Sequence, residues 1–191
     1  MGLAGGRKIC ARQPRERIYK NMGYVNDTHM SQFIPPSIFQ HDTGTWTFNI
    51  FDNIVSNDKN AADEAFGTLI PIPIISNSIA LKGAKLLNIK VFYKIATAAA
   101  DAFADVVLLK NSLGVDDTAA SGESVSISLD SGHDTDAKRL AVDDDHCMTI
   151  TLDDPAWIDD GDVFWLNLGV DCAETTDFAF LGAVANFELR L

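Results

Sequence analysis

The stretch that most constrains this chain is its final one, residues 161–191. Apolar side chains occupy every second position from Phe164 to Cys172, and a second alternating run extends from Leu181 to Leu191. Alternation with a period of two is typical of a β-strand with one face in a core. Since the polar residues 173–177 separate the two runs, they predict two strands joined by a turn. The rest of the chain must then provide strands that pair with them.

Further strand-like segments precede this pair, and no convincing helix of ten or more residues accompanies them. Together they give eight candidate strands, which begin near residues 45, 66, 84, 103, 123, 146, 162 and 178. Pro71 and Pro73 share one parity, so their segment is expected at a sheet edge or at a bulge. The pattern predicts an all-β fold, an eight-stranded antiparallel β-sandwich of the jelly-roll type. The long polar connections 52–64 and 130–145 favour a jelly roll over a meander, while a lipocalin-like barrel and an immunoglobulin-like sandwich are alternatives.

Charge and composition divide the chain into an extended basic arm, residues 1–43, and a single β-sandwich domain, residues 44–191. The whole chain has a net charge of −12, yet residues 1–24 carry six basic side chains against Glu16, so the remainder carries −17. An acidic body argues against broad nucleic-acid binding by the domain itself, whereas a basic arm suits an anionic partner. The expected electrostatic contacts of the arm are Arg7, Lys8, Arg12, Arg15, Arg17 and Lys20.

The arm also contains more apolar and aromatic groups than a solvated tail normally has. Pro35 and Pro36 favour an extended chain just before the domain. The apolar groups need a surface, which is either the arm's own domain or a neighbouring copy. The expected packing contacts are Tyr24, Phe33, Ile34, Ile38 and Phe39.

No pattern in the sequence indicates catalysis. The four histidines, His29, His41, His133 and His146, have no metal-ligand spacing, and we interpret them as surface residues. A triad of Ser131, His133 and Asp134 is rejected, because neighbours on one loop seldom converge and no nucleophile elbow is present. The three cysteines lack CxxC spacing, and Cys172 is interpreted as a buried free thiol. We therefore expect a protein that is not an enzyme.

Acidic loops raise the question of a structural Ca²⁺, because carboxylate oxygens are its preferred ligands. The candidate ligands are Asp130, Asp134 and Asp136, although no EF-hand order is present. The alternative is that these are solvated carboxylates that keep the protein in solution. No cofactor is otherwise indicated.

Aromatic residues on the parity opposite the inferred core face of the last two strands suggest a contact surface. Such rings stack on sugars or pack against a partner subunit, unless the sheet is covered on both sides. The candidates, including one ring in a loop, are Trp157, Trp165, Phe178 and Phe180.

The chain has no apolar run of the roughly 20 residues that a membrane span requires and no secretory signal pattern near its first residue. We therefore expect synthesis in a cytoplasm and no transmembrane segment.

A basic, aromatic-containing arm of about forty residues followed by an acidic eight-stranded sandwich without catalytic residues resembles single jelly-roll structural proteins of viruses and bacteriophages. The resemblance is one of organisation and covers the whole chain. It implies a virion protein, made in the host cytoplasm, that assembles with copies of itself and with other virion proteins. The arm would contact neighbouring subunits, nucleic acid or an internal membrane.

Two other functions are compatible with this pattern. The first is a carbohydrate-binding β-sandwich, such as a phage tail or fibre domain or a lectin-like module, which would use the outward aromatic rings and the Asp-rich loops. The second is a small-molecule-binding barrel, which needs a cavity.

Overall fold

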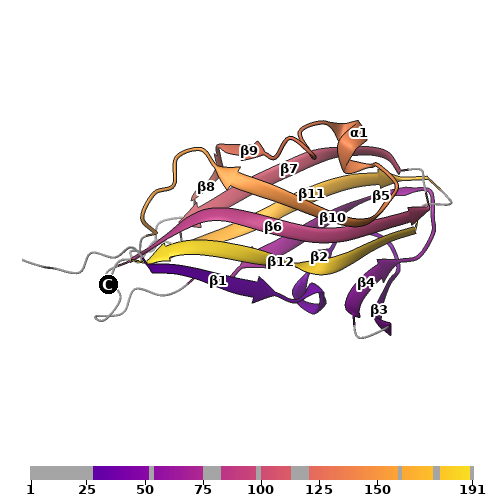
Figure 1. The fold of residues 1–191 in the computed structure, drawn as a ribbon, viewed down its shortest axis with the longest axis horizontal. Helices are drawn as coiled ribbons and strands as arrows, with labels where there is room; N and C mark the ends of the chain where they lie inside the picture. Colours follow the sequence, from indigo (N-terminus) through magenta and orange to yellow (C-terminus); the bar gives the residue numbers. More distant parts are fainter. Residues whose placement is uncertain are drawn as a thin grey trace, which may run out of the picture.

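The computed structural model describes residues 28–51, 54–74, 83–97, 100–112, 121–158, 161–173 and 177–189. Two antiparallel sheets pack face to face as a β-sandwich (Figure 1). The first sheet, called sheet A, has the order β3-β4-β12-β6-β10-β9, and β1 also pairs with β12. The second, called sheet B, has the order β2-β5-β11-β7-β8.

The strands of sheet A are long at its centre and short at its edges. They are β1 (Thr28–Ile34), β3 (Trp46–Phe51), β4 (Ile54–Lys59), β6 (Ala84–Thr97), β9 (Ile127–Leu129), β10 (Asp143–Leu152) and β12 (Asp177–Leu189).

Sheet B contains fewer strands and packs against the inner face of sheet A. Its strands are β2 (Gln40–His41), β5 (Glu64–Ile72), β7 (Ala100–Ser112), β8 (Ser121–Val125) and β11 (Asp162–Cys172). Two short helices complete the described part of the chain, η1 (Pro36–Ile38) and α1 (Asp136–Arg139). No helix among the described residues is long and apolar enough to cross a membrane.

The expected antiparallel β-sandwich is thus confirmed, but the count of eight strands is wrong. A strand occupies each of the eight expected positions, and the described residues contain four more: β1, β2, β4 and β9. Two of these lie in the segment expected to be an extended arm, and β4 lies in the segment 52–64 expected to be a long connection. Each is short or lies at a sheet edge, where the alternating pattern is weakest.

The core between the sheets follows the predicted alternation in β11. Its even-numbered residues from Phe164 to Cys172 are buried, and the odd-numbered ones face outward and are partly exposed. The same pattern continues in β5, where Phe66, Ile70 and Ile72 are buried. Pro71 pairs with Trp165 of β11 on one side, while β2 pairs only with Leu69 and Thr68 on the other. The backbone nitrogen of Pro71, which carries no hydrogen, therefore lies on the unpaired side of β5, as expected for a proline at a sheet edge.

Strand β12 departs from simple alternation, and the prediction for Phe178 and Phe180 is wrong. Both rings are completely buried rather than outward-facing. The register with β6 shifts between Phe180 and Gly182, and Gly182 has a φ of 128°. This bulge inserts one extra residue, so buried positions are even-numbered before it and odd-numbered after it. Alternation read from one end of the strand therefore assigned the other end to the wrong face.

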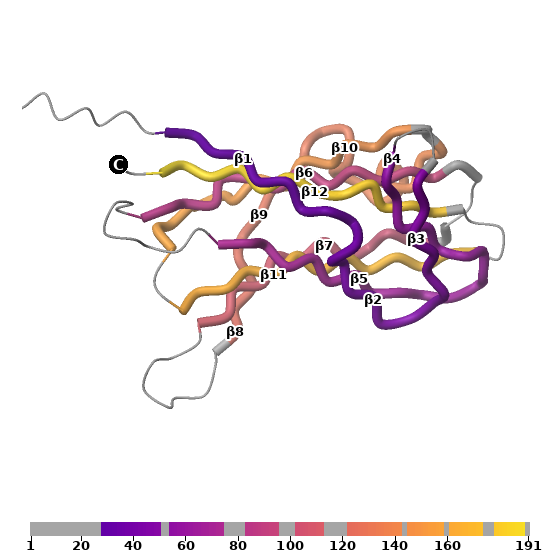
Figure 2. Tube along the Cα trace, turned by 90° about the horizontal axis from the view of Figure 1, so that it is seen from below, coloured from indigo at the N-terminus to yellow at the C-terminus, as the bar shows by residue number. Residues whose placement is uncertain are grey.

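The segment from Thr28 to His41 joins the two sheets. Strand β1 pairs with β12 of sheet A, η1 follows, and β2 then pairs with β5 of sheet B (Figure 2). Ile34 is fully buried and Phe39 is 6% exposed, so both side chains belong to the core. Of the two surfaces considered for the apolar groups of this segment, Ile34 and Phe39 therefore use their own domain.

Candidate functional site

The most distinctive surface feature is a β-hairpin formed by β3 and β4, which lies at one end of sheet A (Figure 1). Trp46 pairs with Lys59 at its base, and Phe51 pairs with Ile54 at its far end. Only the base is joined to the body, since β4 pairs with β12 over three positions, Phe178 to Phe180. The hairpin therefore extends beyond the strand that supports it.

His41 fixes the base of the hairpin. Its ring stacks on Trp46 of β3 with a centroid distance of 3.5 Å and an interplanar angle of 7°. Its Nε2 lies 2.8 Å from Nδ2 of Asn57 in β4, and its Nδ1 lies 2.9 Å from the hydroxyl of Thr68 in β5. A neutral ring suits both contacts, because Nε2 accepts from the Asn57 amide while Nδ1–H donates to Thr68. Burial lowers the pKa of His41 to about 4, against a smaller opposing effect of Asp42.

Lys59 provides a second anchor at the base. Its side chain is fully buried, and its Nζ lies 3.1 Å from a carboxylate oxygen of Glu64. The same ammonium group donates to the carbonyl oxygens of Asn60 and Ala62. A buried cation is tolerated only with such partners. The base of the hairpin is thus held by packing and by polar contacts.

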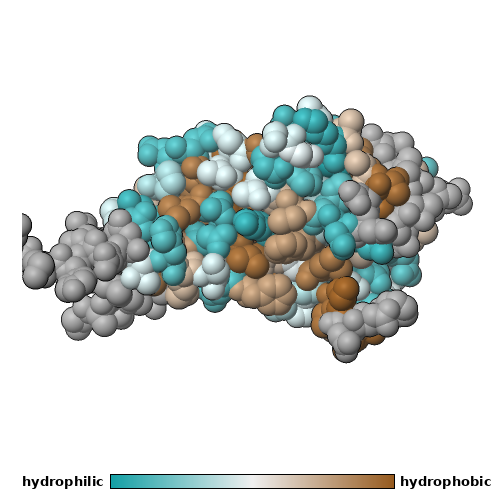
Figure 3. Space-filling model, viewed as in Figure 1, coloured by the Kyte–Doolittle hydropathy of each residue, from teal (hydrophilic) through white to brown (hydrophobic). Residues whose placement is uncertain are grey.

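An apolar stripe continues from this base along one face of the hairpin. Paired residues of antiparallel strands share a face, so Trp46, Phe48, Ile50 and Val55 lie on one side. Trp46 contacts the rings of Phe66 and Phe180 in the core. Beyond it, Phe48 is 50% exposed, Ile50 72% and Val55 38%. Ile54, at the far end of the opposite face, is 53% exposed, and hydrophobic atoms gather at this corner of the surface (Figure 3).

The predicted packing contacts of the amino-terminal segment divide into buried and exposed groups. Ile34 and Phe39 are buried in the core, whereas Phe33 is 60% and Ile38 42% exposed. Tyr24 lies outside the described residues. So do the six predicted electrostatic contacts Arg7, Lys8, Arg12, Arg15, Arg17 and Lys20.

The two remaining aromatic candidates lie apart from each other in the fold. Trp165 is on the outer face of sheet B, between its cross-strand neighbours Pro71 and Leu109, and is partly exposed. Trp157 forms an isolated bridge with Lys85, whose ammonium group lies 4.4 Å from the centre of the indole ring. With Phe178 and Phe180 in the core, the four rings form no continuous exposed row.

A shallow, open depression also lies on the outer face of sheet B, where Gly67 and Gly169 face each other on β5 and β11. A Cβ at Gly67 would lie 2.7 Å from a carboxylate oxygen of Asp42, and one at Gly169 would lie 2.8 Å from Cβ of Asp105. The missing side chains leave room for these acidic groups over the sheet. Asn167 lines the same depression.

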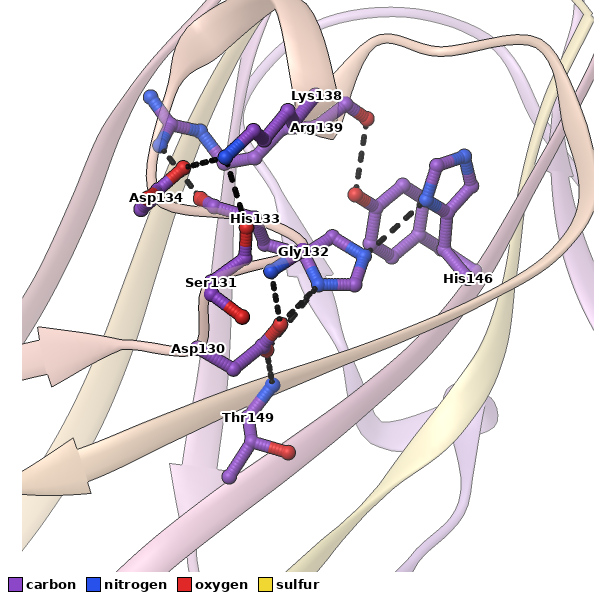
Figure 4. A network of polar contacts seen from close by, with 10 residues as sticks. Asp130, Ser131, Gly132, His133, Asp134, Lys138, Arg139, His146 and Thr149 are labelled. Carbon is purple, nitrogen blue, oxygen red and sulfur yellow. Dashed lines mark hydrogen bonds and ion pairs between the residues drawn. The ribbon is translucent and has the colours of Figure 1, made fainter.

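The Asp-rich loop forms a network that the sequence did not reveal (Figure 4). Asp130 accepts hydrogen bonds from the backbone N–H groups of Thr149 at 2.6 Å and Gly132 at 2.9 Å, and lies 2.9 Å from Nδ1 of His133. Burial alone would raise the pKa of the Asp130 carboxyl, but these hydrogen bonds together lower it below its usual range. The site is therefore built around the Asp130 carboxylate, which accepts its hydrogen bonds from groups of the protein itself.

Two histidine rings extend this network. Nε2 of His133 lies 3.2 Å from Nδ1 of His146, and Nε2 of His146 lies 2.7 Å from the carbonyl oxygen of Ala141. The Asp130 carboxylate and the Ala141 carbonyl group are acceptors, so Nδ1 of His133 and Nε2 of His146 are the nitrogens that donate to them. Both side chains are buried, so their interpretation as surface residues is wrong.

The three Ca²⁺ candidates point to different partners. Asp134 binds the ammonium group of Lys138 at 2.6 Å. Asp136 accepts from the backbone N–H of Phe103 at 2.6 Å. Within the described residues no group of three or more His, Cys, Asp or Glu side chains is arranged to hold a metal ion. A structural Ca²⁺ in this loop therefore gains no support.

No family model matches the chain, and a search of curated proteins found no match.

Sequence reasoning missed the hairpin although a signal was present. The alternating residues from Trp46 to Phe51 are followed by Asp52-Asn53 and then by Ile54-Val55, which is a hairpin pattern with a two-residue connection. His41 carried no such signal, because nothing in its local sequence places it beside Trp46.

Proposed function

We propose that this chain is a virion structural protein, a capsid or capsid-associated subunit, that assembles with copies of itself and with other virion proteins. Its sandwich would be a jelly roll, and its basic amino-terminal segment would contact neighbouring subunits, nucleic acid or an internal membrane. The protein would be made in the host cytoplasm and would act without catalysis or a cofactor.

The observation that carries this proposal is the nested pairing of the strands. The last strand, β12, pairs with the early strands β1 and β4, and β11 pairs with β5. Further inward, β10 pairs with β6, and β7 pairs with β8. These pairs are nested in sequence, from β1 with β12 through β5 with β11 and β6 with β10, as in a long antiparallel ribbon folded over into two sheets. This arrangement is the one expected of a jelly roll, a fold common among capsid proteins.

The surface supports a role in assembly. The stripe on the hairpin is exposed, while the opposite face of the hairpin carries polar groups such as Asn49 and Asp58, and exposed apolar patches mark contact sites. The strong negative charge of the body and the positive charge of the amino-terminal segment would attract each other between copies.

The test is the mass of the purified full-length protein by light scattering at low and moderate salt, with negative-stain images of the same samples. A chain lacking residues 1–27, which leaves every described strand intact, is the comparison. Rings, trimers or shells that depend on this segment would support the proposal. A monomer in every condition, including in the presence of candidate scaffold proteins or nucleic acid, would contradict it.

A second candidate function is carbohydrate binding on the outer face of sheet B. Trp165 shares this face with Asn167 two residues further along β11, beside the depression around Gly67 and Gly169. A ring next to amide and carboxylate groups is a common way to hold a sugar. Glycan-array binding that Trp165→Ala abolishes would favour this function, and an array without signal would exclude it from the glycans tested.

A further inference from the structure

The exposed stripe of Phe48, Ile50 and Val55 continues a core face beyond the body of the molecule. Its first member, Trp46, is packed on Phe66 and Phe180, so the stripe begins in the core and ends in solvent. Leaving three large apolar side chains this exposed is costly at roughly 25 cal/mol per Å² of apolar surface. A partner that covers the stripe would recover this free energy.

Among the described strands, none pairs with the outer edge of β3 beside the stripe. On one side β3 pairs with β4, and sheet A ends at β3 on the other. The strand reads Trp-Thr-Phe-Asn-Ile-Phe and has no charge and no proline. Edge strands are normally protected by charged residues or proline against pairing with another chain. An unprotected edge next to an apolar stripe is suited to receive an added strand.

The chain contains a segment with the composition to be that strand. Residues 18–25 read Ile-Tyr-Lys-Asn-Met-Gly-Tyr-Val, which is rich in aromatic and aliphatic groups, and residues 7–20 supply the six basic side chains. The rest of the chain, residues 25–191, carries a net charge of −17, and Asp58 lies on the polar face of the hairpin. An apolar strand with a basic flank therefore matches the apolar stripe in polarity and the acidic body in charge.

The position of β1 indicates that the segment comes from another copy. Thr28 pairs with Leu189 at one end of β12, whereas Lys59 pairs with Phe178 at the other. At about 3.3 Å per residue these points are roughly 35 Å apart along the strand. Strand β1 thus begins at the end of sheet A that is far from the hairpin of its own copy (Figure 1). Residues 18–25 lie three to ten residues before Thr28, so they reach at most about 10–35 Å from it and cannot run along the hairpin of their own copy.

We propose that the hairpin is the receiving site for the amino-terminal segment of a second copy, which adds a strand along β3 and covers Phe48, Ile50 and Val55. This inference rests on the proposed assembly function and names the contact that would carry it. Repeated from copy to copy, the contact is head-to-tail, so it produces a ring when the rotation closes and a chain of subunits when it does not.

The test uses the full-length protein with a photo-crosslinking amino acid in place of Tyr24, mixed in equal amounts with ¹⁵N-labelled chains. Crosslinked peptides that join labelled and unlabelled chains, with one partner from residues 46–59, would support the inference. Crosslinks within one chain, or to another surface of a neighbour, would overturn it.

Matched variants separate this inference from the proposed function. Ile50→Asp places a charge in the stripe, and Val142→Asp places one at a residue that is 55% exposed in the loop after α1. We expect Ile50→Asp to lower the assembled fraction at least tenfold and Val142→Asp to leave it unchanged, with both proteins folded by circular dichroism. Assembly that needs residues 1–27 but survives Ile50→Asp would overturn the hairpin site and leave the proposed function standing. A wild-type monomer in every condition would remove both.

Discussion

His41 contacts β3, β4, β5 and β12 with one ring, and the burial of this ring makes the stability of the protein sensitive to pH. The folded-state pKa of His41, about 4, lies below the ordinary value of 6.5, so between these values the unfolded chain binds the proton more readily. The stability that neutral His41 supplies is therefore complete above pH 6.5 and is lost as the pH falls towards 4. We expect this loss to be on the order of 2 kcal/mol, after allowance for partial exposure.

Urea unfolding of the wild type and of His41→Phe at pH 7 and pH 4 measures this effect. The variant keeps a ring against Trp46 but has nothing to protonate, so its stability should fall less than that of the wild type. Equal losses in the two proteins would mean that carboxylates alone account for the acid sensitivity.

Tyr93 shows what one buried hydroxyl contributes. Its side chain is fully buried, and its hydroxyl donates to the carbonyl oxygen of Arg139 at 2.8 Å. Burial raises the pKa of Tyr93 above its usual range, more than Arg139 lowers it. Tyr93→Phe keeps the ring stacked on Phe178 and removes only the hydrogen bond, so we expect the free energy of unfolding to fall by about 1–2 kcal/mol. A variant as stable as the wild type in urea would show that the carbonyl group finds another donor.

Strand β12 depends on its bulge more than on any single apolar side chain. Gly182 has a φ that side chains rarely adopt, and a Cβ there would lie 2.8 Å from the ring of Phe33 and 3.0 Å from the carbonyl oxygen of Ile34. We expect Gly182→Ala to lower the free energy of unfolding by about 2–3 kcal/mol, since strain and overlap act together.

Gly122→Ala is the matched control, because a Cβ there would meet only the flexible side chain of Asn111. Its effect in thermal unfolding should be clearly smaller. If the double variant Gly182→Ala with Phe33→Ala recovered full stability, overlap alone would explain the loss and the backbone conformation would not matter.

The same bulge explains what the sequence could predict about single elements and what it could not. Long central strands such as β11 alternate without interruption, so their buried faces were correctly predicted from pattern alone. In β12 one extra residue exchanges the buried and outward faces, and Gly182 is the only local sign of this bulge in the sequence. The hairpin of β3 and β4 was missed for another reason. Its apolar residues pair with polar ones such as Asn57 and face solvent, so β4 does not show the apolar alternation of a core strand.

At the scale of the whole molecule, the boundary between segment and sandwich lies earlier in the chain than charge alone suggested. Residues 28–41 contribute β1, η1 and β2, and Ile34 and Phe39 fill the core. Composition identified the apolar groups of this segment but could not tell a strand of the same domain from one that binds a neighbour, because both bury the same side chains.

Two truncations test this boundary. Removal of residues 1–27 leaves every described strand in place, so we expect a change in the free energy of unfolding below about 1 kcal/mol. Removal of residues 1–40 takes away β1 and two core side chains, each worth several kcal/mol when deleted, and should prevent cooperative folding. Circular dichroism with thermal melting distinguishes the two cases, and a folded protein without residues 1–40 would show that β1 is dispensable.

The nested strand pairing also has a consequence for synthesis on the ribosome. Strand β1 finds its partner only when residues 183–189 have been made, and most of β5 has no partner before β11. Until then the nascent chain holds unpaired strands with one apolar face each, and such non-local pairing folds slowly. The newly made protein therefore passes through a period in which a chaperone, or a neighbouring chain on the same messenger, competes with its own last strand.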